Sequence, residues 1–338
     1  MRAGRVGAAV ACVLAIGIPA AACSSSEPDG SGTESGGATP SGGWSFEDDR
    51  GVTHTLPEVP DAIAAHSVAA GGLWEYGIEI DGVFGPLRRA DGSPDPSIGL
   101  ADPDDFTSLG EVDSEINIEA LAALRPDIIV TSMWDDGVYW GISDEELDEL
   151  ERIAPIVGIR VDDRPVTEPL GRFAELAESL GGDPGRIDDA RARFEAASAG
   201  LSDALAAKPD LAVVAASGSP SEMYVAYPGG FSDLRYFQSL GMQLATPESH
   251  PTSDGFWETL SWEEAGTYPA DLILADGRIG TVEEITDLLP PTAAALPAVQ
   301  ADQLIEWPAS HAFGYGNLGA IMEVLAAEVD RASPDVVD

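Results

Sequence analysis

The stretch DPGRIDDARARFEAASAGLSDALAAKP, residues 183–209, decides how the chain is organised. Asp183 and Pro184 are typical of a helix start: the aspartate can accept a hydrogen bond from the first turn, and proline lacks the N–H that this turn leaves unpaired. Lys208-Pro209 predicts the end of this helix. The residues between would form about 36 Å of helix. Apolar residues recur in steps of three and four, which predicts one buried stripe: Ile187, Ala190, Phe194, Ala197, Leu201 and Leu205.

On both sides of this helix, short strand-like runs alternate with helical ones. A hairpin is expected first, over 44–57. The runs that follow predict strands at 63–68, 78–84, 127–133, 156–161, 211–216, 223–226, 272–275 and 304–307, and helices at 69–76, 118–124 and 144–153. This rhythm is typical of parallel sheets covered by helices on both faces.

We therefore expect an α/β fold of two lobes, each a mostly parallel sheet flanked by helices. The N-terminal lobe would span 44–182 and the C-terminal lobe 208–331. One long helix, 183–207, would cross between them and act as a rigid strut. Two lobes joined in this way should form a cleft that closes only slightly.

Composition excludes several classes of function. The 338 residues include 17 Lys and Arg against 59 Asp and Glu, a net charge of −42. Such a chain lacks the basic face that nucleic acids or anionic lipids require. The two cysteines, Cys12 and Cys23, both precede the α/β pattern. The folded body can therefore contain no disulfide, cysteine nucleophile or thiolate metal site.

The N-terminus indicates export. Arg2 and Arg5 precede an apolar run that is too short for a bilayer span of roughly 20 residues, so 1–22 is expected to be a signal peptide. The sequence Ala-Ala-Ala-Cys that ends in Cys23 resembles the lipobox of bacterial lipoproteins, which implies an acylated cysteine. An ordinary secretory cleavage site near Ala22 is the alternative. Residues 24–43 are mostly Ser and Gly, so 23–43 is expected to be an acylated cysteine followed by a flexible tether of about 25 Å.

A set of short segments then carries a family resemblance. In chain order these are 109–111 (LGE), 117–121 (NIEAL), 124–130 (LRPDIIV), 256–263 (FWETLSWE), 270–274 (ADLIL), 296–299 (LPAV), 307–308 (WP) and 313–316 (FGYG). Their order and spacing resemble the substrate-binding proteins of ABC importers for iron siderophores and vitamin B12, whose lobes are joined by one long helix. The resemblance spans most of 44–330.

This resemblance implies a ligand site in the cleft, and local reasoning agrees. Ligands of open α/β sheets bind beyond the carboxyl ends of the strands, so Trp134 and the loop to Trp140 should face the cleft. Broad aromatic walls suit bulky chelates. The aromatic candidates are Trp134, Tyr139, Trp140, Tyr224, Phe256, Trp257, Phe313 and Tyr315. Trp44, Trp74 and Trp307 are expected to be core residues.

Polar candidates are fewer. Arg88 and Arg89 follow a strand and could pair with an anionic group of a ligand, or simply with nearby acids; Arg278 is a second-lobe candidate. His66 and His311 could line the cleft. No spacing of the histidines predicts a metal site, and none is expected. Ferric-hydroxamate binders of the family carry an arginine just after the Leu-Gly pair, where this chain has Glu111, so that contact is not expected here.

The resemblance also implies a partner. Related proteins dock arginines of their permease with one glutamate on each lobe; Glu263 matches the second-lobe position, and either Glu145 or Glu146 the first. The alternative is that these acids only cap and solvate helices.

The expected function is that of an extracytoplasmic lipoprotein, a monomer, which captures an Fe(III)–siderophore and delivers it to an ABC permease, with no cofactor and no catalysis. A corrinoid or haem ligand is the alternative within the family. An extracytoplasmic hydrolase is the alternative outside it, although no Gly-x-Ser-x-Gly, Walker or Gly-x-Gly-x-x-Gly motif follows a strand.

Overall fold

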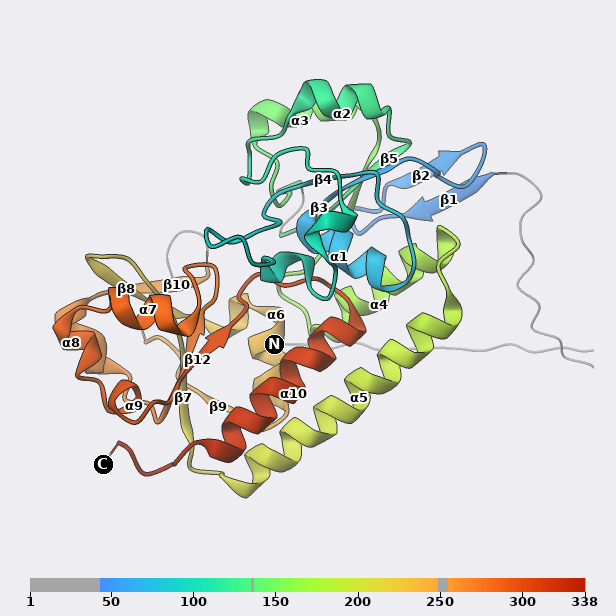
Figure 1. Cartoon of the computed structure of the whole chain (residues 1–338). Helices are drawn as coiled ribbons and strands as arrows, with labels where there is room; N and C mark the ends of the chain where they lie inside the picture. Colours follow the sequence, from blue (N-terminus) through green and yellow to red (C-terminus); the bar gives the residue numbers. More distant parts are fainter. Residues whose placement is uncertain (1–42, 135–136, 249–254, 338) are drawn as a thin grey trace, which may run out of the picture. The chain divides into compact units, whose positions relative to one another are not determined.

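Two separate sheets and a long helix between them form the framework of the computed structural model, which describes residues 43–134, 137–248 and 255–337 (Figure 1). Residues 42–338 form one compact unit. The predicted signal peptide, Cys23 and nearly all of the tether lie outside the described residues.

The first sheet is fully parallel, with the strand order β4-β3-β5-β6. Its central strand β5 is buried at every position, which explains its continuous apolar run. The hairpin β1-β2 forms a small sheet of its own. The bounds are β1 Trp44–Glu47, β2 Thr53–Leu56, β3 Ile63–His66, β4 Gly82–Phe84, β5 Ile128–Met133 and β6 Ile156–Arg160. The helices are α1 Ser67–Glu75, η1 Pro96–Ile98, η2 Pro103–Asp105, α2 Ile118–Leu124, α3 Asp144–Ile153 and α4 Thr167–Ser179.

The largest errors in the predicted boundaries of this lobe are at β4 and at the junction of β3 and α1, where the strand predicted over 63–68 ends at His66. Strand β4 begins at Gly82 rather than residue 78, although Ile78 and Ile80 are buried, because burial produces the same apolar pattern as strand pairing. Helix α1 begins at Ser67 rather than residue 69, because the His66 ring caps it by accepting a hydrogen bond from the Val68 N–H at 3.5 Å.

The second sheet has the order β10-β8-β7-β11-β12, and the short strand β9 also pairs with β7. Pairing is parallel between β7 and β9, β7 and β11, and β11 and β12, and antiparallel between β7 and β8 and between β8 and β10. The bounds are β7 Ala212–Gly218, β8 Glu222–Ala226, β9 Gln243–Leu244, β10 Trp257–Ser261, β11 Leu272–Asp276 and β12 Leu304–Trp307. The helices are η3 Pro228–Gly230, α6 Ser232–Ser239, η4 Trp262–Thr267, α7 Val282–Leu288, α8 Pro291–Ala294 and α9 Pro297–Gln300.

The predicted linking helix is confirmed as a single unbroken element, α5 Pro184–Ala207, with Asp183 accepting a hydrogen bond from the Gly185 N–H at 2.8 Å. The C-terminal helix α10, Tyr315–Arg331, packs along it (Figure 1). The two helices approach closely at Gly319, where a Cβ would lie 3.3 Å from the Phe194 backbone.

Besides the linking helix α5, the C-terminal part of the chain also contacts the first lobe. After β12 the chain returns to the first lobe, where the Phe313 N–H donates to the Val68 carbonyl at 3.3 Å. Glu75 of α1 then accepts hydrogen bonds from the backbone N–H groups of Gly316 and Asn317, at 2.6 and 2.9 Å. A side chain of the first lobe therefore caps the N-terminus of α10. This returning segment has no hydrophobic periodicity, so sequence patterns do not reveal it.

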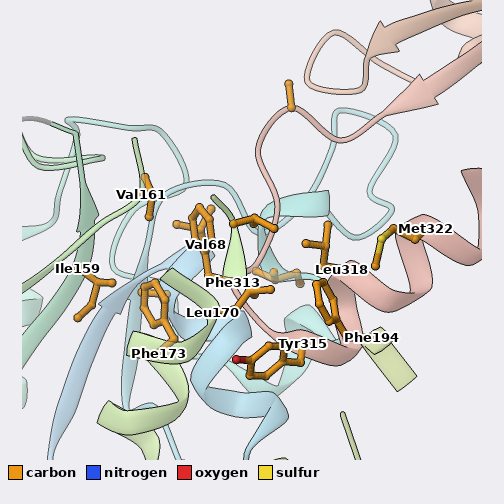
Figure 2. Packing of buried hydrophobic residues seen from close by; sticks show 14 of the residues in the cluster. Val68, Ile159, Val161, Leu170, Phe173, Phe194, Phe313, Tyr315, Leu318 and Met322 are labelled. Atoms are coloured by element: carbon orange, nitrogen blue, oxygen red, sulfur yellow. The ribbon is translucent and has the colours of Figure 1, made fainter. Parts of the chain in front are cut away.

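One continuous apolar core joins the two lobes through α5 and α10. Figure 2 shows its centre, where Phe173 of α4 stacks on Phe313 of the returning segment with ring centroids 5.6 Å apart, and Phe194 of α5 meets Tyr315 of α10 at 5.5 Å. A shared core of this kind permits only small movements of one lobe against the other. No helix in the described part of the chain is long and apolar enough to span a bilayer.

Candidate ligand-binding cleft

A cavity of about 270 Å³ opens where the two lobes meet. Its wall is formed by residues just beyond the carboxyl ends of β5, β6, β11 and β12 and by the N-terminus of α6, in keeping with the rule for open α/β sheets. The lining residues are Trp134, Trp140, Val161, Asp162, Gly230, Phe231, Ser232, Asp233, Phe256, Trp257, Arg278, Ala309, His311 and Phe313.

Aromatic rings form a continuous wall from one lobe to the other. Trp134 meets Trp140 edge to face at 5.3 Å on the first lobe and meets Phe256 of the second lobe at 6.5 Å. Phe231 then contacts both Phe256 and Trp257, at 5.2 and 5.1 Å. The structure therefore brings the two predicted tryptophans, Trp134 and Trp257, to one cavity. Their role in ligand binding stays a prediction.

A histidine–aspartate pair, His66 and Asp113, contacts Trp140 of this wall. His66, only 1% exposed, shares a hydrogen bond with Asp113 at 2.9 Å, and the Trp140 indole N–H donates to the same carboxylate at 3.4 Å. Burial would raise the pKa of Asp113, but these two hydrogen bonds and the nearby charges of His66 and Arg278 outweigh it and hold this pKa below its usual range. His66 thus positions Trp140 and does not itself line the cavity.

Arg278 lies on the cavity wall, and its role in ligand binding stays a prediction. Its guanidinium makes a two-pronged contact with Asp276, at 2.9 and 2.7 Å, and stands 5.6 Å from the centre of the Trp257 ring. Burial would lower the pKa of Arg278, but Asp276 and the more distant carboxylates Asp113 and Asp95 raise it. The group is therefore a permanent cation.

The structure places the other predicted ligand contacts away from the cavity, with partners of their own. Arg88 pairs with Asp104 at the surface, 2.6 Å away. Arg89 forms an ion pair across the lobes with Glu306. The remaining three are Tyr139, which is buried against Arg50, Tyr224, whose hydroxyl donates to Glu222, and Tyr315, which is buried against Phe194.

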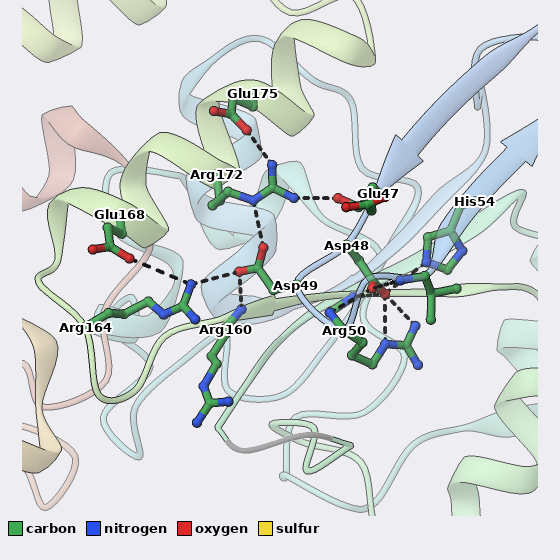
Figure 3. Close-up of polar contacts among 12 residues, drawn as sticks. Glu47, Asp48, Asp49, Arg50, His54, Arg160, Arg164, Glu168, Arg172 and Glu175 are labelled. Carbon is green, nitrogen blue, oxygen red and sulfur yellow. Dashed lines mark hydrogen bonds and ion pairs between the residues drawn. The ribbon is translucent and has the colours of Figure 1, made fainter. Parts of the chain in front are cut away.

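The hairpin turn holds His54 in a hydrogen-bonded cluster. Figure 3 shows Asp48 accepting hydrogen bonds from His54 at 3.0 Å and from Arg50, while the neighbouring Asp49 accepts from Arg172 at 2.7 Å. Asp49 also accepts from the backbone N–H of Arg160 at 2.9 Å, so the turn holds the end of β6, from which the cavity wall continues.

Sequence reasoning missed several cavity residues. Asp162 and Phe231 each lie between a predicted strand and the helix that follows it, and this position at the carboxyl end of a strand could have identified them. No local pattern identifies Asp233 or Ala309. His250 lies outside the described residues. Within 43–134, 137–248 and 255–337, no cluster of three His, Cys, Asp or Glu side chains is arranged to hold a metal ion.

The predicted docking glutamates lie in Ser-x-Glu-Glu sequences at the starts of helices, and a related Thr-x-Glu-Glu sequence starts a third helix. In each sequence the second glutamate is used for helix capping. Ser143 and Glu146 form a reciprocal capping box at the start of α3, as do Ser261 and Glu264 at η4. Glu145 and Glu263, the residues between, are exposed. A third box, Thr281 and Glu284, begins α7.

Comparison with protein families matches residues 101–311 to the family described as periplasmic binding protein. The chain belongs to this family. Members are substrate-binding proteins without catalytic activity, so the expectation of binding without catalysis is confirmed.

Solved structures of periplasmic binding proteins agree with this assignment. DesE, a ferric-siderophore receptor protein from Streptomyces coelicolor, is 39% identical with a TM-score of 0.81, covering 86% of this chain and 99% of its own. FeuA, a triscatecholate siderophore binding protein from Bacillus subtilis, is 14% identical with a TM-score of 0.63, covering 85% and 98%. FhuD2 from Staphylococcus aureus, solved with ferrioxamine B, is 16% identical with a TM-score of 0.56, covering 80% and 98%. The last two share the fold alone. A comparison with curated proteins found no match.

Proposed function

We propose that this periplasmic binding protein captures a ferric siderophore in the interlobe cleft and, as a monomer, delivers it to an ABC permease. The observation that carries the proposal is the 39% identity to a ferric-siderophore receptor over 86% of this chain. The aromatic wall of the cavity supports it, because flat rings offer a bulky chelate a large contact area at little cost in conformational entropy. The cavity of about 270 Å³ is just below the range of roughly 300–1,000 Å³ for small-molecule sites, so part of the chelate would remain in solvent.

The proposed contact with the permease uses Glu145 and Glu263. Their neighbours are occupied, because the carboxylate of Glu146 accepts hydrogen bonds from the Ser143 N–H and hydroxyl at 3.0 and 2.7 Å. Glu264 does the same with Ser261, at 3.1 and 2.8 Å. Glu145 is therefore a better candidate than Glu146 on the first lobe. Acylation of Cys23 would hold the protein at the outer face of the cytoplasmic membrane, with the tether allowing the folded body to reach the permease.

Tryptophan fluorescence tests the ligand class. Trp134, Trp140 and Trp257 line the cavity, so a ferric siderophore should quench emission on titration, whereas the iron-free siderophore should quench less. Haem and cobalamin are the comparison ligands. Saturable quenching by either of these, with none by any ferric siderophore, would replace the proposed ligand by the alternative one. Turnover of ester or phosphoester substrates would instead indicate a hydrolase.

A further inference from the structure

Negative charge predominates around the cleft. Within the residues that the structure describes, three charged side chains line the cavity, namely Asp162, Asp233 and Arg278. Asp162 pairs with Arg160 at 2.9 Å, so that pair adds no net charge. Asp233 is 4% exposed and accepts a hydrogen bond from the Trp307 indole N–H at 2.7 Å. Among the described residues no lysine or arginine pairs with this carboxylate, which makes it a negative charge in the wall without a cationic partner.

The positive charge of Arg278 is more than balanced. Asp276 contacts it directly, and Asp113 and Asp95 are near enough to raise its pKa. Counting these three with Asp162 and Asp233 gives five carboxylates, against the guanidiniums of Arg278 and Arg160. Among the described residues counted here, the charge is 2 − 5 = −3 if His66 and His311 are neutral and 4 − 5 = −1 if both are protonated, so it is negative in either case. Another ion pair at the lobe boundary, Arg235 with Asp163 at 3.0 Å, cancels internally.

Two further features bear on this balance. The N-terminus of α6 faces the cavity, and the helix dipole supplies roughly half a positive charge there. The carboxylate of Asp233, in the first turn of α6, already compensates this charge. The Trp257 ring already has the guanidinium of Arg278 over it, 5.6 Å from its centre, so this part of the aromatic wall accommodates a cation. Neither feature reverses the negative balance of the carboxylates.

We infer that the cleft selects ferric complexes without net negative charge, the neutral or cationic class formed by three hydroxamate groups, and disfavours tris-catecholate complexes. Each hydroxamate loses one proton on binding, so three of them neutralise Fe(III), whereas three catecholates lose two protons each and leave a trianion. The inference rests on the proposed function and narrows its substrate class. The fold does not decide the question, because it is shared by a triscatecholate binder and by a protein solved with ferrioxamine B.

Three probes of different charge test this inference by tryptophan quenching of the purified protein: cationic ferrioxamine B, neutral ferrichrome and trianionic ferric enterobactin. At low salt we expect the neutral complex to bind at least tenfold more tightly than the trianion, from interactions of several charges at partial screening. The cation should bind at least as tightly as the neutral complex. Raising NaCl from about 20 mM to about 500 mM should weaken binding of the cationic complex several-fold and change the affinity for the neutral complex less than twofold.

Charge variants then test the cause. Asp233→Asn keeps an oxygen that can accept from Trp307, and it should reduce the preference for cation over trianion by roughly three- to tenfold. Arg278→Gln removes a positive charge and should increase the preference for the cationic complex over the trianion. The matched control is Asp188→Asn on α5, whose side chain is 78% exposed and outside the cavity; it should leave the ratio unchanged.

The ratio of two ligands on one variant does not depend on how much of the sample is folded. Trianion binding as tight as that of the neutral complex, or ratios that neither cavity variant changes, would overturn this inference and leave siderophore binding intact. Binding of no ferric complex at all would overturn the proposed function instead.

Discussion

Gly72→Ala in helix α1 tests whether the returning C-terminal segment positions the cleft. A Cβ at this position would lie 2.7 Å from the Phe313 carbonyl oxygen and 2.9 Å from its carbonyl carbon. Ordinary contact begins near 3.4 Å, so the segment would have to move by about 0.7 Å. Because both clashing atoms belong to the backbone, no side-chain rotation relieves them.

The magnitude follows from two opposing contributions. Overpacking costs about 2 kcal/mol, within the usual range of 1–3 kcal/mol. Alanine in a helix interior gains about 1 kcal/mol over glycine. Gly72→Ala should therefore lower the free energy of unfolding by about 1 kcal/mol. Gly200→Ala on α5 is the matched control: no atom lies within 4 Å of the new Cβ, so the variant should gain about 1 kcal/mol.

Urea unfolding followed by circular dichroism measures both variants, and a quenching titration with the ligand measures the cleft. Gly72→Ala should also weaken ligand binding, since the displaced residue Phe313 lines the cavity. The Gly200 variant should bind normally. Equal stabilisation by the two substitutions would refute the close approach of α1 to the returning segment.

Two further predictions concern the hairpin turn and the permease. Asp48 is buried, and although burial would raise its pKa, hydrogen bonds from Arg50 and His54 outweigh this and lower it. Such a carboxylate stabilises the fold above its unfolded-state pKa of about 4 and loses this contribution as pH falls through the lower folded-state value. Asp48→Asn should cost roughly 3 kcal/mol at pH 7, and the gap to wild type in urea midpoints should close only below about pH 4. Glu145→Arg combined with Glu263→Arg should abolish ligand uptake by cells while quenching titrations of the purified variant stay unchanged; normal uptake would contradict the proposed docking contacts.

Local sequence signals anticipated much of the fold. The periodicity of 184–207 and its flanking residues Asp183 and Lys208 correctly gave both ends of α5, because caps and an apolar stripe depend on residues within a few turns of one another. Strand β12 was predicted with its observed bounds for a similar reason. Where burial occurred without strand pairing, as at Ile78, the same signal gave a strand that is too long.

The cleft was anticipated only in part. Trp134 and Trp257 could be placed there because one follows a parallel strand and the other belongs to a family segment. Arg89 has the same local character as a ligand-binding arginine, yet it pairs with Glu306, more than two hundred positions away in the chain. Nothing near Arg89 in sequence identifies that partner.

The sequence alone therefore determined the α/β class and the rigid helix between the lobes, because both follow from patterns repeated over short distances. The aromatic candidates for the site came partly from the family resemblance. Only the tertiary structure decided that Glu75 caps α10, that His66 and Asp113 support Trp140, and which carboxylates surround the cavity. These contacts join residues from separate elements, and a chain with a charge of −42 contains too many acids for composition to reveal which of them meet.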